Sequence, residues 1–239
     1  MSEVIVEILG DAKLVVYSKI GENHLKNNIE NQDAYEYRRD ENGNYALVVA
    51  DGVSSCQNSK TGAELACKTV CNLLPVIASK TEYEIKELVF SSWKKNLNGQ
   101  WDDFGTTLNF FYLIGEKILI GKIGDGAIIT KIGAEHYVIA DNNDFHSSET
   151  FAFGEKLPKE AFYLKSFEIK NESVYAILMT DGIFNELEEK QIEDFTNYVI
   201  SNIENEHFVI ELEEWFENLD KRNGDDKTII IYKLEKKNG

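Results

Sequence analysis

The sequence predicts an α+β protein in which helices cover β-sheets. Two features indicate this class: strand-like apolar segments recur along the whole chain, and two pairs of amphipathic helical segments interrupt them. Helices and sheets each have an apolar face that must be buried against another layer, so this order favours helices packed on sheets. There is no repeat, linker or low-complexity tract, and we expect residues 1–239 to form one domain.

The N-terminal part is expected to be mostly β-structure. Gly10 and Asp11 separate two strand-like segments, and a polar stretch follows them. A turn before a buried strand is then strongly indicated by the sequence Asp40-Glu41-Asn42-Gly43. We predict strands at 4–9, 13–20 and 34–38, a loop at 21–32, a turn at 40–43 and a strand at 44–50.

Two consecutive helices are predicted next. Small and apolar residues recur at helical spacing over 59–78, where Asn58 or Ser59 can cap the helix. Pro75 is expected to kink this helix or end it early. The residues from Thr81 to Glu84 form a capping box that opens the second helix.

The second half returns to strands and ends with another helix pair. Short strands separated by glycine turns predict an antiparallel meander, and a polar segment at about 141–161 reads as a long loop or flap. The predicted strands are 107–114, 117–123, 127–132, 136–140, 162–169, 174–180 and 227–234, and the predicted helices are 187–200 and 208–219.

Two buried strands each end in an Asp-Gly pair, and the chain is organised around them. One strand delivers Asp51 and the other Asp181, and both strands are continuously apolar, as if covered on both faces. Carboxylates at strand ends can meet at one edge of a sheet. Buried carboxylates that approach each other need a proton, a basic partner or a cation. A metal ion is the interpretation that we favour.

The composition limits the partners and the location of the protein. There are 42 Asp and Glu against 25 Lys and Arg, a formal charge of −17, which argues against nucleic acids and anionic membranes as partners. No apolar run approaches the roughly 20 residues of a membrane span, and no secretory signal opens the chain. Three cysteines give neither a disulfide framework nor a zinc site. We therefore expect a cytoplasmic protein.

Further aspartates sit at strand ends or tight turns, and two alternatives remain open for them. Asp125 could shape a hairpin between 117–123 and 127–132, or it could serve a site. Asp225 and Asp226 are adjacent and would point to opposite faces of a strand, so either could face a site. The full set is Asp33, Asp51, Asp125, Asp181, Asp225 and Asp226.

Six motifs together carry a family resemblance over about residues 20–234. They are Asn31-Gln32-Asp33-Ala34, Val49-Ala50-Asp51-Gly52, Phe104-Gly105-Thr106-Thr107, Ile123-Gly124-Asp125-Gly126, Met179-Thr180-Asp181-Gly182 and Gly224-Asp225-Asp226-Lys227-Thr228. The set resembles the metal-dependent Ser/Thr protein phosphatases of type 2C, particularly compact bacterial members. The resemblance implies an α-β-β-α sandwich, with two central antiparallel sheets flanked by helix pairs.

The resemblance also implies a centre with two Mg²⁺ or Mn²⁺ ions and, in bacterial members, a weaker third ion. Asp51 would bridge both ions, the Gly52 carbonyl would bind one, and Asp181 and Asp225 would hold the other. Asp125 would help to bind the third. Oxygen ligands suit Mg²⁺ and Mn²⁺ better than zinc. The stretch around Thr106 is more typical of a structural role than a catalytic one.

Three departures from the family pattern bear on activity. The Glu expected before Asp33 is Gln32, a neutral and weaker ligand. The phosphate-binding Arg expected five residues before Asp33 falls on Asn28, and a His often found after the first Asp-Gly is Val53. The candidate substitutes for the missing Arg are His24, Arg38 and Arg39, of which His24 is nearest in the loop.

Two hypotheses follow for the function. The first is a phosphatase that removes phosphate from seryl and threonyl residues of a phosphorylated protein, in a pathway with a kinase, using a water activated by two metal ions. The cysteines have no part in that reaction. The second is a catalytically weak or inactive binding or regulatory module on the same fold, which Gln32 and the missing Arg motivate.

Overall fold

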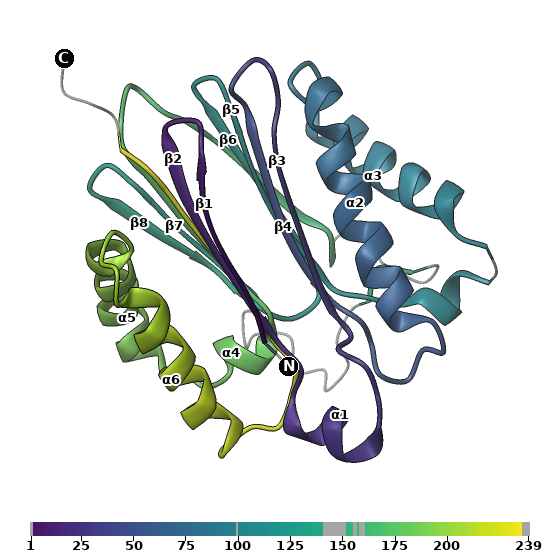
Figure 1. Ribbon diagram of the computed structural model, residues 1–239. Coiled ribbons are helices and arrows are strands. Elements are labelled where there is room, and N and C mark those ends of the chain that lie inside the picture. The colour runs from purple at the N-terminus through teal and green to yellow at the C-terminus, as the bar shows by residue number, and fades with distance from the viewer. Residues whose placement is uncertain (1, 99, 141–151, 155–156, 158–160, 236–239) are drawn as a thin grey trace.

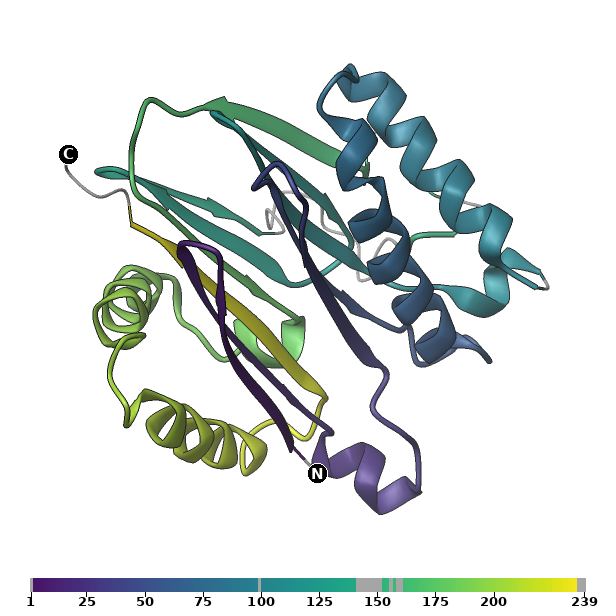
Figure 2. The same cartoon turned by 45° about the horizontal axis from the view of Figure 1, so that its top comes forward.

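Two antiparallel sheets stack face to face, and a pair of helices covers the outer face of each (Figure 1). The computed structural model describes residues 2–98, 100–140, 152–154, 157 and 161–235. The layers therefore follow the order α-β-β-α, which confirms the predicted fold class. Figure 2 shows the same layers from a tilted view, with the helix pairs on opposite sides of the stacked sheets.

The first sheet has six strands in the order β1-β2-β11-β10-β7-β8. Every neighbouring pair in it is antiparallel. Its two central strands, β11 and β10, are almost fully buried, as their continuously apolar sequences predict. The bounds are β1 Ser2–Leu9, β2 Ala12–Lys19, β7 Ala127–Ile132, β8 Glu135–Ile139, β10 Val174–Met179 and β11 Lys227–Leu234.

The second sheet has five strands in the order β3-β4-β5-β6-β9, also antiparallel throughout. Strand β4 lies inside this sheet and carries Asp51 at its end, opposite Asp33 of β3 in the register. The bounds are β3 Asp33–Arg39, β4 Tyr45–Asp51, β5 Leu108–Ile114, β6 Lys117–Ile123 and β9 Tyr163–Glu168.

Helices α2 and α3 cover the five-stranded sheet, and α5 and α6 cover the six-stranded one (Figure 1). A third apolar cluster fills the space between the sheets. None of the described helices is both long and apolar enough to cross a membrane. The bounds are α1 Glu22–Asn27, α2 Ser59–Ile77, α3 Glu82–Asn96, the 3₁₀ helix η1 Trp101–Phe104, α4 Asp181–Phe184, α5 Glu189–Asn202 and α6 Phe208–Asp220.

The predicted four-strand meander is wrong in one respect, because it is divided between the two sheets. Strand β6 pairs with β5 and β9, whereas β7 pairs with β10 and β8. The Gly124–Gly126 segment thus carries the chain from one sheet to the other and does not close a hairpin. This removes the hairpin interpretation of Asp125.

One local prediction around the helices was also wrong, and one of the two alternatives for Pro75 is excluded. The predicted polar loop at 21–32 contains the short helix α1, which has no buried residue and therefore no apolar periodicity. Pro75 does not end α2 early, since the helix continues to Ile77. The capping box that opens α3 is confirmed: the Thr81 and Glu84 side chains each accept a hydrogen bond from the other residue's backbone N–H.

The predicted flap at 141–161 lies largely outside the described residues. Among those described, Phe153 is fully buried and stacks on Trp93 of α3, with ring centroids 4.2 Å apart. The Phe153 N–H also donates to the Thr106 carbonyl at 2.6 Å. At Phe153, this segment is therefore packed into the core between α3 and the five-stranded sheet.

Candidate metal centre

The two sheets bring their acidic strand ends together at one end of the sandwich. Asp33 and Asp51 come from β3 and β4 of one sheet, and Asp181 follows β10 of the other. The Thr180 hydroxyl, immediately before Asp181, donates to Asp33 Oδ2 at 2.8 Å and so joins the sheets. Helix α1 lies at this same end (Figure 1).

The backbone of Asp51 is fixed by the neighbouring threonines. The Asp51 N–H donates to the Thr107 hydroxyl at 2.9 Å, and the Thr106 hydroxyl donates to the Asp51 carbonyl at 2.9 Å. The Thr107 N–H donates to the same carbonyl at 2.7 Å. These threonines hold the strand tip through its backbone, which is the structural role that the sequence indicated.

The glycine after each aspartate is required by close packing of the backbone. A Cβ atom at Gly182 would lie 2.0 Å from the carbonyl oxygen of Asp226, and one at Gly52 would lie 2.7 Å from the carbonyl carbon of Ser59. Neither site leaves room for a side chain. The Asp-Gly pairs therefore mark places where another segment touches the strand tip, and they are not hairpin turns.

Three carboxyl groups in this cluster have raised pKa values. Burial is the largest cause for Asp33, Asp51 and Asp181, and mutual repulsion among neighbouring carboxylates adds to it. Asp51 and Asp181 lie close enough for a hydrogen bond between their carboxyl groups. Asp125, Asp225 and Asp226 belong to the same network, because each repels at least one of the three. All six predicted aspartates are thus brought together.

Several buried oxygen atoms here lack a hydrogen-bond donor. They belong to Gln32 (Oε1), Asp33 (Oδ1), Asp181 (Oδ1) and Asn109 (Oδ1). Buried acceptors without a partner cost free energy, so such a group points to a missing cation or water. Within the described ranges no three His, Cys, Asp or Glu side chains already surround one point. Ion binding would therefore require rotation of carboxylate side chains, and the oxygen-only donor set fits Mg²⁺ or Mn²⁺.

The two adjacent aspartates before β11 have different environments. Asp226 is buried, and its carboxylate accepts hydrogen bonds from Gly21 N at 2.7 Å and Gln32 N at 2.6 Å. Its Oδ2 also lies 2.8 Å from His24 Nδ1. Asp225 is exposed, and its Oδ1 accepts the N–H of Asp226. Asp226 is thus occupied with holding the segment around α1, which leaves Asp225 as the candidate ligand.

Asp125 sits on the crossover between sheets, and buried polar side chains hold its backbone. Asn109 Nδ2 donates to the Asp125 carbonyl at 2.9 Å, and the Lys122 ammonium donates to the Gly124 carbonyl. Asp125 is half-buried and repels Asp181. The crossover therefore carries its carboxylate to the edge of the acidic cluster.

Residues that the sequence analysis missed hold the acidic segments in place. Lys227 is fully buried in β11 and donates to the carbonyls of Asn223 and Asp225, both at 2.7 Å. Lys122 and Asn109 act in the same way at the Asp125 crossover. Their signal in the sequence was a polar side chain within an otherwise apolar strand. Such a residue is rarely buried unless it has a polar partner.

The candidate substitutes for the missing phosphate-binding Arg are in different places. His24 lies in α1 beside Asp226, at the edge of the acidic cluster. Arg38 and Arg39 are at the other end of β3, about 20 Å along the strand from Asp33, where they contact Asn72 and Tyr45. These two arginines are too distant to replace the missing Arg.

The fold and the acidic strand ends are those of a known class of proteins. The family model of protein phosphatase 2C matches residues 20–217. The chain therefore belongs to the protein phosphatase 2C family. A comparison with curated proteins gave no match.

Solved structures show the same fold. The chain is similar to RsbX in complex with magnesium, with a TM-score of 0.63 and 14% identity over 98% of this chain and 100% of that one. It is also similar to the S. agalactiae serine/threonine phosphatase, with a TM-score of 0.60 and 19% identity over 98% and 100% of the chains. It is similar as well to the catalytic domain of the serine/threonine protein phosphatase PstP in complex with two manganese ions. That match has a TM-score of 0.64 and 15% identity over 93% of this chain and 97% of that one.

Proposed function

We propose that this chain is an active phosphatase that hydrolyses phosphoserine and phosphothreonine in proteins, and that it depends on Mg²⁺ or Mn²⁺. The observation that carries the proposal is the cluster of carboxyl groups from both sheets, in which Asp33 is buried, Asp51 and Asp181 are half-buried, and buried oxygen atoms lack a donor; burial and mutual repulsion raise the pKa values of all three. Such groups destabilise the fold at neutral pH unless a cation neutralises them. Membership of the protein phosphatase 2C family supports the reaction class.

We assign the ion-holding role to oxygens at the ends of the strands. Asp51, with the Gly52 carbonyl, Asp181 and Asp225 would hold two ions, and Asp125 would contribute to a weaker third. When bound, such ions stabilise the negative charge on a phosphoryl group and lower the pKa of an attacking water. Gln32 and Asp33 are the supporting groups, because each has a buried oxygen atom without a donor.

The residues of the chain itself position these oxygens. Thr180 fixes the Asp33 carboxylate, and the Lys227 ammonium holds the Asp225 carbonyl. Asp226 takes no part in ligation, since the backbone N–H groups of Gly21 and Gln32 occupy its two oxygens. His24, beside Asp226, is the basic group that we propose for contact with the substrate phosphate. Preorganised dipoles and charges of this kind act without reorganisation during the reaction.

We further propose a phosphorylated protein as substrate, in a cytoplasmic pathway with a kinase, and a single domain spanning residues 1–239. We also propose that the segment 141–161 borders the substrate site; of its described residues, Phe153 donates its N–H to the Thr106 carbonyl. The strongly acidic surface argues against nucleic acid and anionic membrane as partners.

Release of phosphate from a phosphothreonine peptide is the direct test. Turnover should require Mn²⁺ or Mg²⁺ and should stop in EDTA, with Asp51→Asn as the matched inactive control. Calorimetric metal titration of the same samples separates two failures. Metal binding without turnover would indicate the inactive regulatory module that Gln32 and the missing Arg motivate. Undiminished turnover in EDTA would overturn the metal assignment.

A further inference from the structure

The two helix layers differ in charge and packing. Residues 59–96, which span α2 and α3, contain four Glu and six Lys, a net charge of +2. Residues 189–220, which span α5 and α6, contain ten Asp or Glu and one Lys, a net charge of −9. More than half of the formal charge of −17 therefore lies on one of the two helix layers.

The acidic residues of the α5–α6 layer are largely without basic partners. Among the described acidic residues from Glu189 to Glu217, only Glu204 has an ion pair, with Lys13 and Lys233; Lys190 pairs with Glu188, just before this range. Of the other acidic residues in this range, Glu213 is half-buried and the rest are exposed. A surface of one sign with few internal counter-charges attracts partners of the opposite sign over distances up to the Debye length.

An apolar groove lies within this acidic layer. Helices α2 and α3 run side by side, whereas α5 and α6 cross (Figures 1 and 2) and touch through aromatic side chains, with the Phe195 and Trp215 ring centroids 5.2 Å apart. A groove of about 230 Å³ lies between the two helices, lined by Phe195, Tyr198, Val199, Glu211, Leu212 and Trp215. Tyr198 is 47% exposed, and its hydroxyl donates to the Glu211 carboxylate on the opposite wall.

The lining has the composition of a recognition site. Aromatic side chains, especially Trp and Tyr, supply much of the binding energy in protein interfaces. The groove residues are spaced i, i+3 and i+4 along α5, which is the spacing that receives side chains from one face of a helical segment. Carboxylates around the groove would contact cationic side chains flanking that face.

We propose that the α5–α6 groove is a docking site for a basic, amphipathic segment of a partner protein. Bulky apolar side chains of the segment fill the groove, and its Lys and Arg side chains face the surrounding carboxylates. Charge excludes the other occupants: a second copy would oppose two faces of net charge −9, and anionic lipids and nucleic acids would be repelled. This site lies on the outer face of the six-stranded sheet and does not depend on the proposed phosphatase reaction.

The test uses the 239-residue chain with Mg²⁺ and a fluorescent peptide. The peptide is designed to form a helix with Leu and Trp on one face and Lys on the other. Fluorescence anisotropy should give saturable binding that weakens as salt rises from 50 to 500 mM. Two variants should each raise the dissociation constant about tenfold or more: Tyr198→Ala, and the double variant Glu211→Lys with Glu214→Lys. A peptide with Ser in place of Leu and Trp should bind at least tenfold more weakly.

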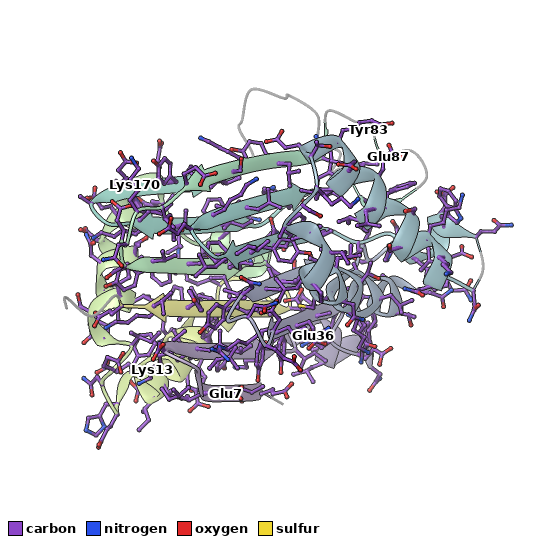
Figure 3. All side chains as sticks on the ribbon, turned by 90° about the horizontal axis from the view of Figure 1, so that it is seen from above. Glu7, Lys13, Glu36, Tyr83, Glu87 and Lys170 are labelled. Atoms are coloured by element: carbon purple, nitrogen blue, oxygen red, sulfur yellow. The ribbon has the colours of Figure 1, made fainter. Side chains whose placement is uncertain are left out.

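Matched controls come from the other helix layer. Tyr83 on α3 is 64% exposed, and Glu87 lies on the same helix (Figure 3). Tyr83→Ala, and Glu82→Lys with Glu87→Lys, make the same chemical changes there and should leave the affinity within about twofold. The Asp51→Asn variant should bind the peptide with unchanged affinity. It serves as a control because the acidic strand ends could attract the cationic peptide independently of the groove.

Three results would overturn the proposal. They are absence of saturable binding, equal losses in the α3 control variants, and a concentration-dependent dimer that Tyr198→Ala abolishes. The last result would identify a second copy of the chain as the occupant. Circular dichroism of each variant checks that the helices remain folded.

Discussion

Two aspartates from the same end of the sandwich have opposite relations to the fold. Asp226 is buried, but its carboxylate receives two backbone N–H groups and faces His24. Asp51 is next to Asp33, Asp181 and Asp225, and burial and repulsion raise its pKa. The first carboxylate therefore stabilises the structure, whereas the second destabilises it in the absence of a cation.

This difference distinguishes aspartates that hold the structure in place from aspartates that are available to bind an ion. A carboxylate whose oxygens are satisfied by the protein has little capacity left for a ligand. A carboxylate that is packed against other carboxylates retains free lone pairs, and it is stabilised most when a cation binds. The predictions below test this distinction, from the largest expected effect to the smallest.

Asp51→Asn should remove nearly all metal-dependent turnover, by about a thousandfold or more, and should raise the stability of the metal-free protein. The amide keeps the shape and removes a charge that repels Asp181. We expect a gain on the order of 1 kcal/mol in the free energy of unfolding, a typical size for relief of an unfavourable site. Phosphate release and thermal unfolding in EDTA measure the two effects.

The sign of the pH dependence follows from the raised pKa of Asp51. A carboxyl group with a folded pKa above its unfolded value stabilises the protein below the unfolded value, near 4. That contribution is lost as pH rises through the folded pKa. The gain from Asp51→Asn should therefore be larger at pH 7.5 than at pH 5, and a gain independent of pH would contradict this origin.

Asp226→Ala should have the opposite effect on stability. The substitution leaves the N–H groups of Gly21 and Gln32 without their acceptor, at a cost of about 2–3 kcal/mol in the free energy of unfolding. Urea unfolding of the metal-free protein measures it. Asp225→Ala is the matched control on the neighbouring, exposed residue and should cost less than about 1 kcal/mol. Equal losses would mean that the two carboxylates are not distinguished as described.

Asp125→Asn should lower turnover about tenfold, a loss of ~1.4 kcal/mol of transition-state stabilisation, while tight metal binding persists. The crossover should keep its shape, because Asn109 and Lys122 hold the backbone carbonyl groups of Asp125 and Gly124, which the substitution leaves in place. Calorimetry and a Mn²⁺ titration of the rate compare binding with turnover. An unchanged rate across that titration would leave Asp125 with only a structural part in the crossover.

Gln32→Glu should produce the smallest change. It places a further carboxylate where an amide oxygen now lacks a donor, so the Mn²⁺ concentration for half-maximal activity should fall a few-fold. In EDTA the same variant should unfold at a lower temperature, since it adds charge to the buried cluster. If neither the metal titration nor the unfolding temperature moves, Gln32 does not face the ions.

Much of the architecture was predictable because it follows from local patterns. Strands β4 and β10 are continuous apolar runs, and the capping box at Thr81 marks the start of α3. Helix α6 has an apolar stripe that faces the sheet. In each case the signal lies within one short stretch of sequence, so the local residue pattern is enough to predict the element.

The errors arose where distant contacts decide the local structure. Helix α1 has no buried residue and is held through Asn23 N–H to the Gly224 carbonyl and through His24 to Asp226. The Gly124–Gly126 segment suits a hairpin and a crossover equally well, and only strand pairing distinguishes them. The different environments of Asp225 and Asp226 also depend on α1, which belongs to a remote part of the sequence.

The position of the acidic cluster has a mechanical consequence for the sandwich. Asp33 and Asp51 belong to one sheet, and Asp181 and Asp225 follow or precede strands of the other. Ions shared between these groups would cross-link the sheets at one end, whereas the β1–β2, β3–β4 and β5–β6 turns lie at the opposite end (Figure 1). Metal binding should therefore slow amide hydrogen exchange along a gradient, most strongly in the strand tips beside Thr180 and least in those turns.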